Sequence, residues 1–231
     1  MTFDVQRVRA CFPALAEGAA HFDGPGGSQV PQSVADAVAS TLTSAISNRG
    51  RVTRSSRRAD EIVVAAREAV GDLLGTEPGG VVFGRSMTQL TFDAARTLSR
   101  SWGPGDEVVV TRLDHDANIR PWAYAAAASG ATLRWVEMDA STGELAAESL
   151  AAALTDRTRL VAVTAASNLV GTRPDVASIS RAAHEVGALT FVDGVHSTAH
   201  VLPDMARLGA DLFVCSPYKF CGPHCGVLAA R

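Results

Sequence analysis

Short apolar runs rich in β-branched residues alternate with longer alanine-rich segments along most of this chain. Several of the runs are apolar almost throughout, which is typical of strands covered on both faces. Glycine and proline mark many of the joints between segments. Alternation of this regularity predicts an α/β fold with a parallel or mostly parallel sheet. We predict strands at residues 81–83, 107–111, 133–137, 159–164, 189–193, 211–215 and 226–229. We predict helices at residues 31–46, 59–74, 88–101, 118–129, 144–154 and 176–186.

The composition and charge are those of a globular protein that binds neither nucleic acid nor a membrane. The chain has 231 residues, of which 47% are hydrophobic, and its formal net charge is -3 at pH 7. A chain of this size can bury a core without disulfides or metals, and its charge argues against binding to nucleic acid or to an acidic membrane. We recognise no signal peptide and no apolar run long enough to cross a membrane. We therefore expect a cytoplasmic protein whose four cysteines are reduced thiols.

Two polar residues follow predicted strands at points where ligands bind in open α/β sheets. Asp193 ends the apolar run 189–193, and Lys219 follows the run 211–215. Taken alone, such an aspartate can equally be a helix cap or a metal ligand. A lysine in apolar surroundings is rarer, and burial favours the neutral amine that condenses with an aldehyde. An amine and a carboxylate on neighbouring strand ends are what pyridoxal 5'-phosphate (PLP) needs for its aldehyde and its protonated ring nitrogen.

The same two segments carry a family resemblance. The sequences DGVHSTAH at 193–200 and CSPYKFCGPH at 215–224 resemble the aspartate and lysine motifs of class V aminotransferases. Within that family the chain is most similar to the cysteine desulfurase-like subfamily. Further similar segments, in order along the chain, are FDGPGGSQVP, VVFGRSMTQLTF, GDEVVVTRLDHDANIRPW and RLVAVTAASNLVGT.

The resemblance implies a fold and a domain organisation. The implied fold is the large domain of a fold-type I PLP-dependent transferase, with a mixed, mainly parallel seven-stranded sheet flanked by helices and an antiparallel last strand. Residues 1–58 are expected to form an N-terminal arm and helix near the active site, and residues 59–231 the PLP-binding large domain. Relatives continue into a smaller C-terminal domain, which we expect to be absent from this chain, so that the chain is truncated.

The resemblance also implies three catalytic residues. Lys219 matches the lysine that forms a Schiff base with PLP, and Asp193 matches the partner of the pyridine nitrogen. His115 matches the imidazole that stacks on the face of the ring and can also shuttle protons. The alternative for His115 is an ordinary exposed loop histidine.

Further PLP contacts follow from the same matches. Asn168 is expected to reach the phenolic oxygen of PLP or the substrate carboxylate, and His196 is expected beside that oxygen. Many cysteine desulfurases have histidine at the position of Tyr218, where a phenol can still donate a hydrogen bond. The phosphate is expected at a helix N-terminus, held by Met87, Thr88, Ser216 and Tyr218.

Other features leave alternatives open. The segment 24–27 is rich in glycine but lacks the dinucleotide fingerprint, and it resembles a loop near the substrate side of PLP. The segment 48–50 resembles a loop near the active site, often across a dimer interface, although the five arginines of 49–58 can equally be surface residues. Arg85 can contact the phosphate or solvent.

Cys221, His224 and Cys225 lack the fourth ligand of a zinc site, so we expect no metal. The nucleophilic cysteine of desulfurases lies in a C-terminal loop with no counterpart here.

The implied function is that of a PLP-dependent lyase or transferase acting on a small amino-acid substrate, as a homodimer. Cleavage of the C–S bond of L-cysteine is the expected reaction. Other class V chemistry, namely transamination, epimerisation or β-elimination, stays open, as does a catalytically silent PLP-binding fragment.

Overall fold

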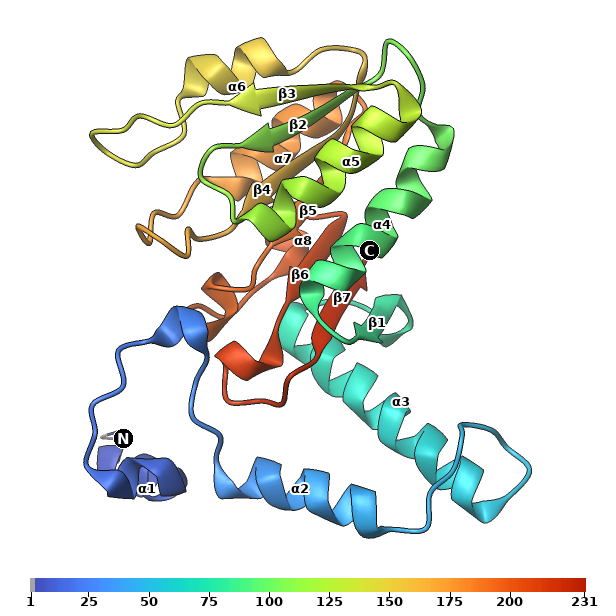
Figure 1. Cartoon of the computed structure of the whole chain (residues 1–231), viewed down its shortest axis with the longest axis vertical. Helices are drawn as coiled ribbons and strands as arrows, with labels where there is room; N and C mark the ends of the chain where they lie inside the picture. Colours follow the sequence, from blue (N-terminus) through green and yellow to red (C-terminus); the bar gives the residue numbers. More distant parts are fainter. Residues whose placement is uncertain (1–2) are drawn as a thin grey trace.

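The computed structural model describes residues 3–231 and contains a seven-stranded sheet (Figure 1). The strands follow the order β1-β7-β6-β5-β4-β2-β3 across the sheet. All seven predicted strands are present, and their ends differ from the prediction by one residue at most. The strands are β1 (Val81–Gly84), β2 (Glu107–Thr111), β3 (Thr132–Val136), β4 (Thr158–Thr164), β5 (Leu189–Asp193), β6 (Leu212–Cys215) and β7 (Gly226–Ala230).

The pairing of the strands confirms a mixed, mainly parallel sheet. The five strands β3, β2, β4, β5 and β6 pair in parallel with one another, in that order. β7 is antiparallel to both β6 and β1, as predicted for the last strand. Asp193 at the end of β5 lies in register with Thr164 of β4 and Val214 of β6. The carboxyl ends of three adjacent strands therefore meet at one edge of the sheet.

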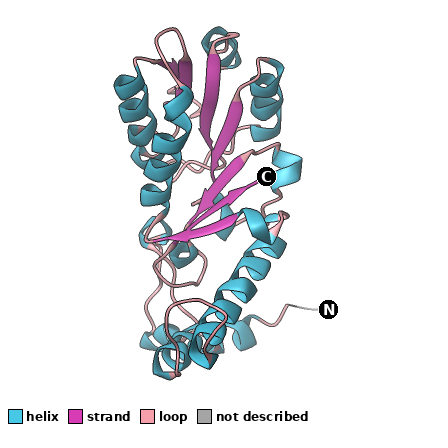
Figure 2. Cartoon of the chain, turned by 90° about the vertical axis from the view of Figure 1, so that its right-hand side faces the viewer, coloured by secondary structure: helices cyan, strands magenta, loops and turns pink. Residues whose placement is uncertain are grey.

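Helices cover both faces of this sheet (Figure 2). α4 and α5 pack on one face around the buried Trp122 and Phe191. α3, α6, α7 and α8 contribute to the core on the other face, around Phe213 and Val192. Apolar strands buried on both sides explain why the sequence shows continuous hydrophobic runs instead of alternation. The helices are α1 (Val5–Ala10), α2 (Gln32–Thr43), α3 (Arg54–Leu74), α4 (Met87–Leu98), α5 (Arg120–Ser129), α6 (Ala147–Ala153), α7 (Val176–Glu185) and α8 (Met205–Leu208).

Some helix limits differ from the prediction. α3 begins at Arg54, five residues before the predicted start, because Thr53 and Ser56 form a capping box that starts the helix there. The expected domain limit after residue 58 falls inside this helix. α6 starts later than predicted because Leu145 forms a β-bridge with Met138. The short helices α1 and α8 were not predicted, since a single turn carries little periodic signal.

The N-terminal segment extends away from the sheet (Figure 1). Neither α1 nor α2 contains a buried residue. Val38 and Leu42 of α2 are exposed, as are Ile62 and Val64 of α3. Residues 1 and 2 of the expected arm lie outside the described residues. None of the helices in the described range 3–231 combines the length and apolar character that crossing a bilayer requires.

Candidate active site

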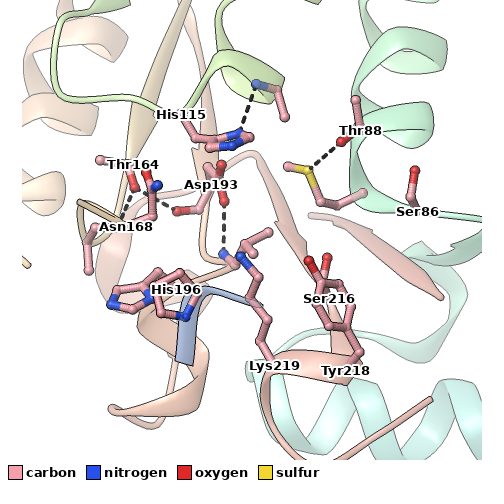
Figure 3. Close-up of a pocket in the computed structure, with 15 residues that line it drawn as sticks. Ser86, Thr88, His115, Thr164, Asn168, Asp193, His196, Ser216, Tyr218 and Lys219 are labelled. Carbon is pink, nitrogen blue, oxygen red and sulfur yellow. Dashed lines mark hydrogen bonds between the residues drawn. The ribbon is translucent and has the colours of Figure 1, made fainter. Parts of the chain in front are cut away.

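A cavity of about 190 Å³ lies at the carboxyl ends of the central strands (Figure 3). The structure brings all nine residues expected at a PLP site to this one cavity, although they come from distant parts of the sequence. The nine are Met87, Thr88, His115, Asn168, Asp193, His196, Ser216, Tyr218 and Lys219.

Asp193 forms the floor of the cavity at the end of β5. The residue is 4% exposed, and its Oδ1 accepts a hydrogen bond of 2.9 Å from the backbone N–H of Val195. Its Oδ2 accepts no hydrogen bond within the described chain. Desolvation raises the pKa of Asp193, while the Val195 N–H and the nearby His115 and Lys219 oppose the rise. A cationic partner in the cavity would stabilise the ionised carboxylate.

The turn after Asp193 requires a glycine. A Cβ atom at Gly194 would lie 1.9 Å from the Phe213 ring, so only glycine lets the chain pass this close to the core of β6. This close passage brings the Val195 N–H to the Asp193 carboxylate.

Lys219 reaches the cavity from the single turn Pro217–Lys219 that follows β6. Within residues 3–231 its amine forms no ion pair and no hydrogen bond. Desolvation lowers the pKa of Lys219, and the charge of Asp193 only partly opposes this shift. The neutral amine is therefore more populated than in a lysine exposed to water.

His115 stands before the 3₁₀ turn Asp116–Asn118 and caps it. Its Nδ1 accepts a hydrogen bond of 3.1 Å from the Ala117 N–H. A neutral imidazole that accepts through Nδ1 carries its proton on Nε2. His115 therefore offers Nε2–H as a donor. The residue is exposed, as expected for the alternative of a loop histidine, but it also lines the cavity.

The N-terminus of α4 forms another wall of the cavity. Ser86 caps the helix by accepting a hydrogen bond of 3.1 Å from the Gln89 N–H. The backbone N–H groups of Met87 and Thr88 have no acceptor within the described chain, and both residues line the cavity. A Cβ at Gly226 would lie 2.2 Å from the Ser86 carbonyl carbon, so a glycine in β7 permits this close packing. Free N–H groups and the helix dipole make this wall suited to an anion.

Two hydroxyl side chains stand near the same wall. Ser216 is 2% exposed and its hydroxyl has no partner within the described residues, while the Tyr218 ring stacks on His224 with centroids 4.4 Å apart. Thr88 Oγ1 is directed at Met87 Sδ, at 3.5 Å. Sulfur is a weak acceptor, so this hydroxyl can turn to a stronger one.

Asn168 and His196 line the cavity near Asp193. Asn168 follows β4 in a turn where Ser167 Oγ accepts from the backbone N–H groups of Leu169 and Val170. The pKa of His196 is lowered, chiefly by desolvation and further by His200 and Lys219. His196 is therefore neutral at neutral pH and packs edge-on against His200, with ring centroids 5.0 Å apart.

Several residues that line the cavity are not among those predicted from the sequence. Ser86 and Thr164 both line the cavity. A helix cap before an apolar run could have indicated Ser86, and Thr164 is a polar residue at the end of a buried strand. Pro25 also lines the cavity, in agreement with the resemblance of the 24–27 loop, whereas Arg85 and the 48–50 loop do not.

The cysteines provide no metal site in this structure. Across residues 3–231 no cluster of three or more His, Cys, Asp or Glu side chains is arranged to hold a metal ion. The four thiols are free. Burial raises the pKa of Cys215 to about 12, so this thiol is not a nucleophile at neutral pH.

Comparisons with known proteins agree with this geometry. Residues 20–231 match the sequence model of the family described as Aminotransferase class-V. The Mycobacterium tuberculosis protein described as Uncharacterized protein MT3887 is 39% identical over 235 residues, which is 100% of this chain and 58% of that protein. A cysteine desulfurase of Synechococcus elongatus is 35% identical over 233 residues, which is 96% of this chain and 36% of that protein.

A solved structure supports the same assignment. The apo structure of a cysteine desulfurase from Thermococcus onnurineus NA1 superimposes with a TM-score of 0.92 at 27% identity, covering 100% of this chain and 58% of that one. This chain thus spans 58% or less of the length of these proteins. The predicted fold class, the large domain of a fold-type I PLP-dependent transferase, is confirmed.

Proposed function

Because this chain belongs to the class V aminotransferase family, whose members depend on PLP, we propose that it is the cofactor-binding part of a PLP-dependent enzyme. We further propose cysteine desulfurase-like chemistry on L-cysteine. In that reaction the C–S bond breaks, the sulfur passes to an acceptor thiol as a persulfide, and alanine is released. The similarity to proteins described as cysteine desulfurases supports this choice of substrate.

One observation carries the cofactor assignment. Lys219 and Asp193 come from neighbouring strand ends to a single cavity, and the unpartnered N–H groups of Met87 and Thr88 stand at its wall. An amine, a desolvated carboxylate and an anion-binding helix N-terminus match the aldehyde, the ring nitrogen and the phosphate of PLP. The donor set therefore fits the cofactor chemically.

The residues around the cavity have complementary tasks in this proposal. When bound, PLP withdraws electrons from the α-carbon of an amino acid. Lys219 would hold the cofactor until the amine of a substrate displaces it, and the freed neutral amine would then accept or relay the proton of the α-carbon. Asp193 would keep the proton on the pyridine nitrogen through its free Oδ2. Ser216 and Thr88 would donate to the phosphate together with the α4 N-terminus.

Three further residues orient the cofactor and the substrate. His115 would cover one face of the ring and present Nε2–H as a donor. His196 and Asn168 lie on the opposite side of Asp193 from α4 (Figure 3), where a neutral imidazole and an amide can donate to the phenolic oxygen or the substrate carboxylate. In this assignment Asp193 is the residue that would keep the pyridine nitrogen protonated and therefore positively charged.

We also propose a homodimer in which residues 1–58 act as an arm near the active site and residues 59–231 as the PLP-binding domain. The absence of buried residues in α1 and α2 supports a partner for this arm. The 48–50 loop does not line the cavity of its own chain, which is compatible with a position at a partner's site.

The free cysteines support a cytoplasmic location.

Lys219 is the only lysine in the chain, which makes the test direct. Incubation with PLP followed by borohydride reduction should fix one PLP per chain, and peptide mass spectrometry should locate it on Lys219. Lys219→Ala should lose both the adduct and the visible absorbance of bound PLP. An unmodified Lys219, with PLP bound elsewhere or not at all, would refute the cofactor assignment.

The substrate requires a separate assay. Incubation with L-cysteine and a thiol should release alanine and sulfide in equal amounts, and Lys219→Ala should abolish both products. PLP binding with release of pyruvate or keto acid instead would favour other class V chemistry. PLP binding with no turnover of L-cysteine or other amino acids would favour a silent domain.

A further inference from the structure

Asp114 is a second acidic residue beside the cavity and has no role in the proposed function so far. Its Oδ2 lies 2.5 Å from Thr111 Oγ1, and its Oδ1 accepts a hydrogen bond of 2.7 Å from Asn118 Nδ2. Asn118 is fully buried and its Oδ1 in turn accepts from Trp122 Nε1 at 3.1 Å. A continuous set of hydrogen bonds therefore runs from the hydrophobic core to the residue that precedes His115.

These contacts close the loop that carries His115. The loop begins after Thr111 at the end of β2 and ends at Asn118, whose backbone N–H donates to the His115 carbonyl at 2.8 Å. Asp114 bridges both ends of this loop with its two oxygens. The orientation of the His115 ring, set by the Ala117 N–H, thus depends on the bridge.

The bridge contains no positive charge. Within residues 3–231, Asp114 forms no ion pair with lysine, arginine or histidine, whereas the adjacent Asp116 pairs with Arg120. The neighbours are all neutral, namely Thr111 of β2, Asn118 of the 3₁₀ turn and the backbone of Thr164 in β4. The charged group acting on Asp114 is the carboxylate of Asp193 on β5. Asp114 is half-buried, and a partly desolvated carboxylate with neutral partners and a like charge nearby is stabilised when it holds a proton.

We propose that Asp114 is a positioning residue that stays protonated at neutral pH and holds the His115 loop without placing a second negative charge next to Asp193. Its role rests on the proposed function, because His115 and Asp193 face the cofactor there. A charged Asp114 would push a proton onto Asp193 and weaken the partner of the ring nitrogen. Desolvation, reinforced by Asp193, raises the pKa of Asp114 to about 8, although its bonds to Thr111 and Asn118 oppose the rise.

Asp114→Asn is the informative substitution. An asparagine has the shape of the protonated acid, and its Nδ2 can donate to Thr111 while its Oδ1 accepts from Asn118. Since the folded pKa is raised, the stability contributed by the protonated form is lost as pH rises toward about 8. Relative to that of Asp114→Asn, the unfolding equilibrium constant of the wild type should therefore rise by roughly tenfold per pH unit between about pH 4 and pH 8.

Urea unfolding of the cofactor-free chain at several pH values measures this difference. Asp116→Asn is the matched control from the same loop. The Arg120 hydrogen bond lowers the pKa of Asp116, so the wild type should lose stability relative to this variant as pH falls. A wild-type stability that stays level or grows relative to Asp114→Asn as pH rises would show an ionised Asp114 and overturn the proposal.

The positioning role has its own readout in the ¹⁵N ring shifts of His115. The wild type and Asp114→Asn should both show an unprotonated Nδ1, whereas Asp114→Ala should show a mixture of tautomers. Thr111→Val removes one of the two bonds to Asp114 and should give a smaller fraction of the second tautomer. This variant replaces Asp114→Ala in the measurement if Asp114→Ala does not fold. Wild-type ring shifts in Thr111→Val or Asp114→Ala would overturn the positioning role. Neither measurement uses PLP, so failure of the wild type to bind PLP would refute the proposed function and leave these results in force.

Discussion

Asp193 and Lys219 line the same cavity from the ends of two paired strands, β5 and β6, yet their side chains form no ion pair. Each charge affects the pKa of the other, so they are close enough to interact through the cavity. Separation without direct contact leaves space for a flat group between an amine and a carboxylate. This relationship supports the proposed PLP site more strongly than either residue alone.

Replacing Asp193 by asparagine should preserve the cavity and weaken PLP binding. The amide keeps the shape of the side chain but cannot form an ion pair with a protonated ring nitrogen. A hydrogen bond between charged groups contributes about 1.5–3 kcal/mol, which corresponds to a loss of about tenfold to a hundredfold in affinity. Spectroscopic titration with PLP measures this loss, and Asp106→Asn, which removes a surface partner of Arg159, serves as the control. Equal affinity in Asp193→Asn and the wild type would contradict the assigned role.

The amine of Lys219 should react at lower pH than an ordinary lysine. Desolvation lowers its pKa, so the fraction of neutral amine at neutral pH is larger in the folded chain than in the unfolded one. Reductive methylation of the cofactor-free protein at a series of pH values, followed by mass spectrometry, gives the titration of this single lysine. The urea-unfolded chain is the control and should titrate at higher pH. Coincident curves would mean that the amine is exposed to water.

A methyl group at position 194 should destabilise the fold through Phe213. The Cβ of Gly194→Ala would overlap the ring, and overpacking of this kind costs about 1–3 kcal/mol of unfolding free energy. Phe213→Leu in the same chain should recover part of the loss, because the smaller side chain leaves space for the methyl group. Urea unfolding of the two single variants and the double variant measures the coupling. Gly103→Ala should be nearly neutral, since nothing lies within 4 Å of a Cβ there. Strict additivity of the two substitutions would exclude a steric contact.

Removal of the cap of α4 should affect both stability and cofactor affinity. Ser86→Ala loses the hydrogen bond to the Gln89 N–H and should lower the unfolding free energy by about 1 kcal/mol. Asp175→Ala removes the comparable cap of α7, a bond of 3.1 Å to the Ser178 N–H, and should cost about as much. PLP affinity should fall several-fold only in Ser86→Ala, because α4 begins at the cavity and α7 does not. An equal loss of affinity in both variants would mean that general destabilisation is responsible.

Much of the fold follows from local patterns in the sequence. Continuous apolar runs predict the seven strands within one residue, since burial on both faces leaves a signal in every position of a strand. The same runs place Asp193 and Lys219 after β5 and β6, and parallel pairing of those strands brings their ends to one edge. Resemblance to a known family added residues in loops, such as Asn168, which have no periodic signal of their own.

Other properties depend on contacts between residues far apart in the chain. The unpartnered N–H groups of Met87 and Thr88 line the cavity only because Gly226 lets β7 pack against Ser86. The raised pKa of Asp114 arises from desolvation and from Asp193 on another strand. Which segments form strands, and which residues stand at their ends, are local properties that can be predicted from the order of residues. Protonation, hydrogen bonding and desolvation at the cavity depend on which distant atoms come into contact, and they follow only from the folded chain.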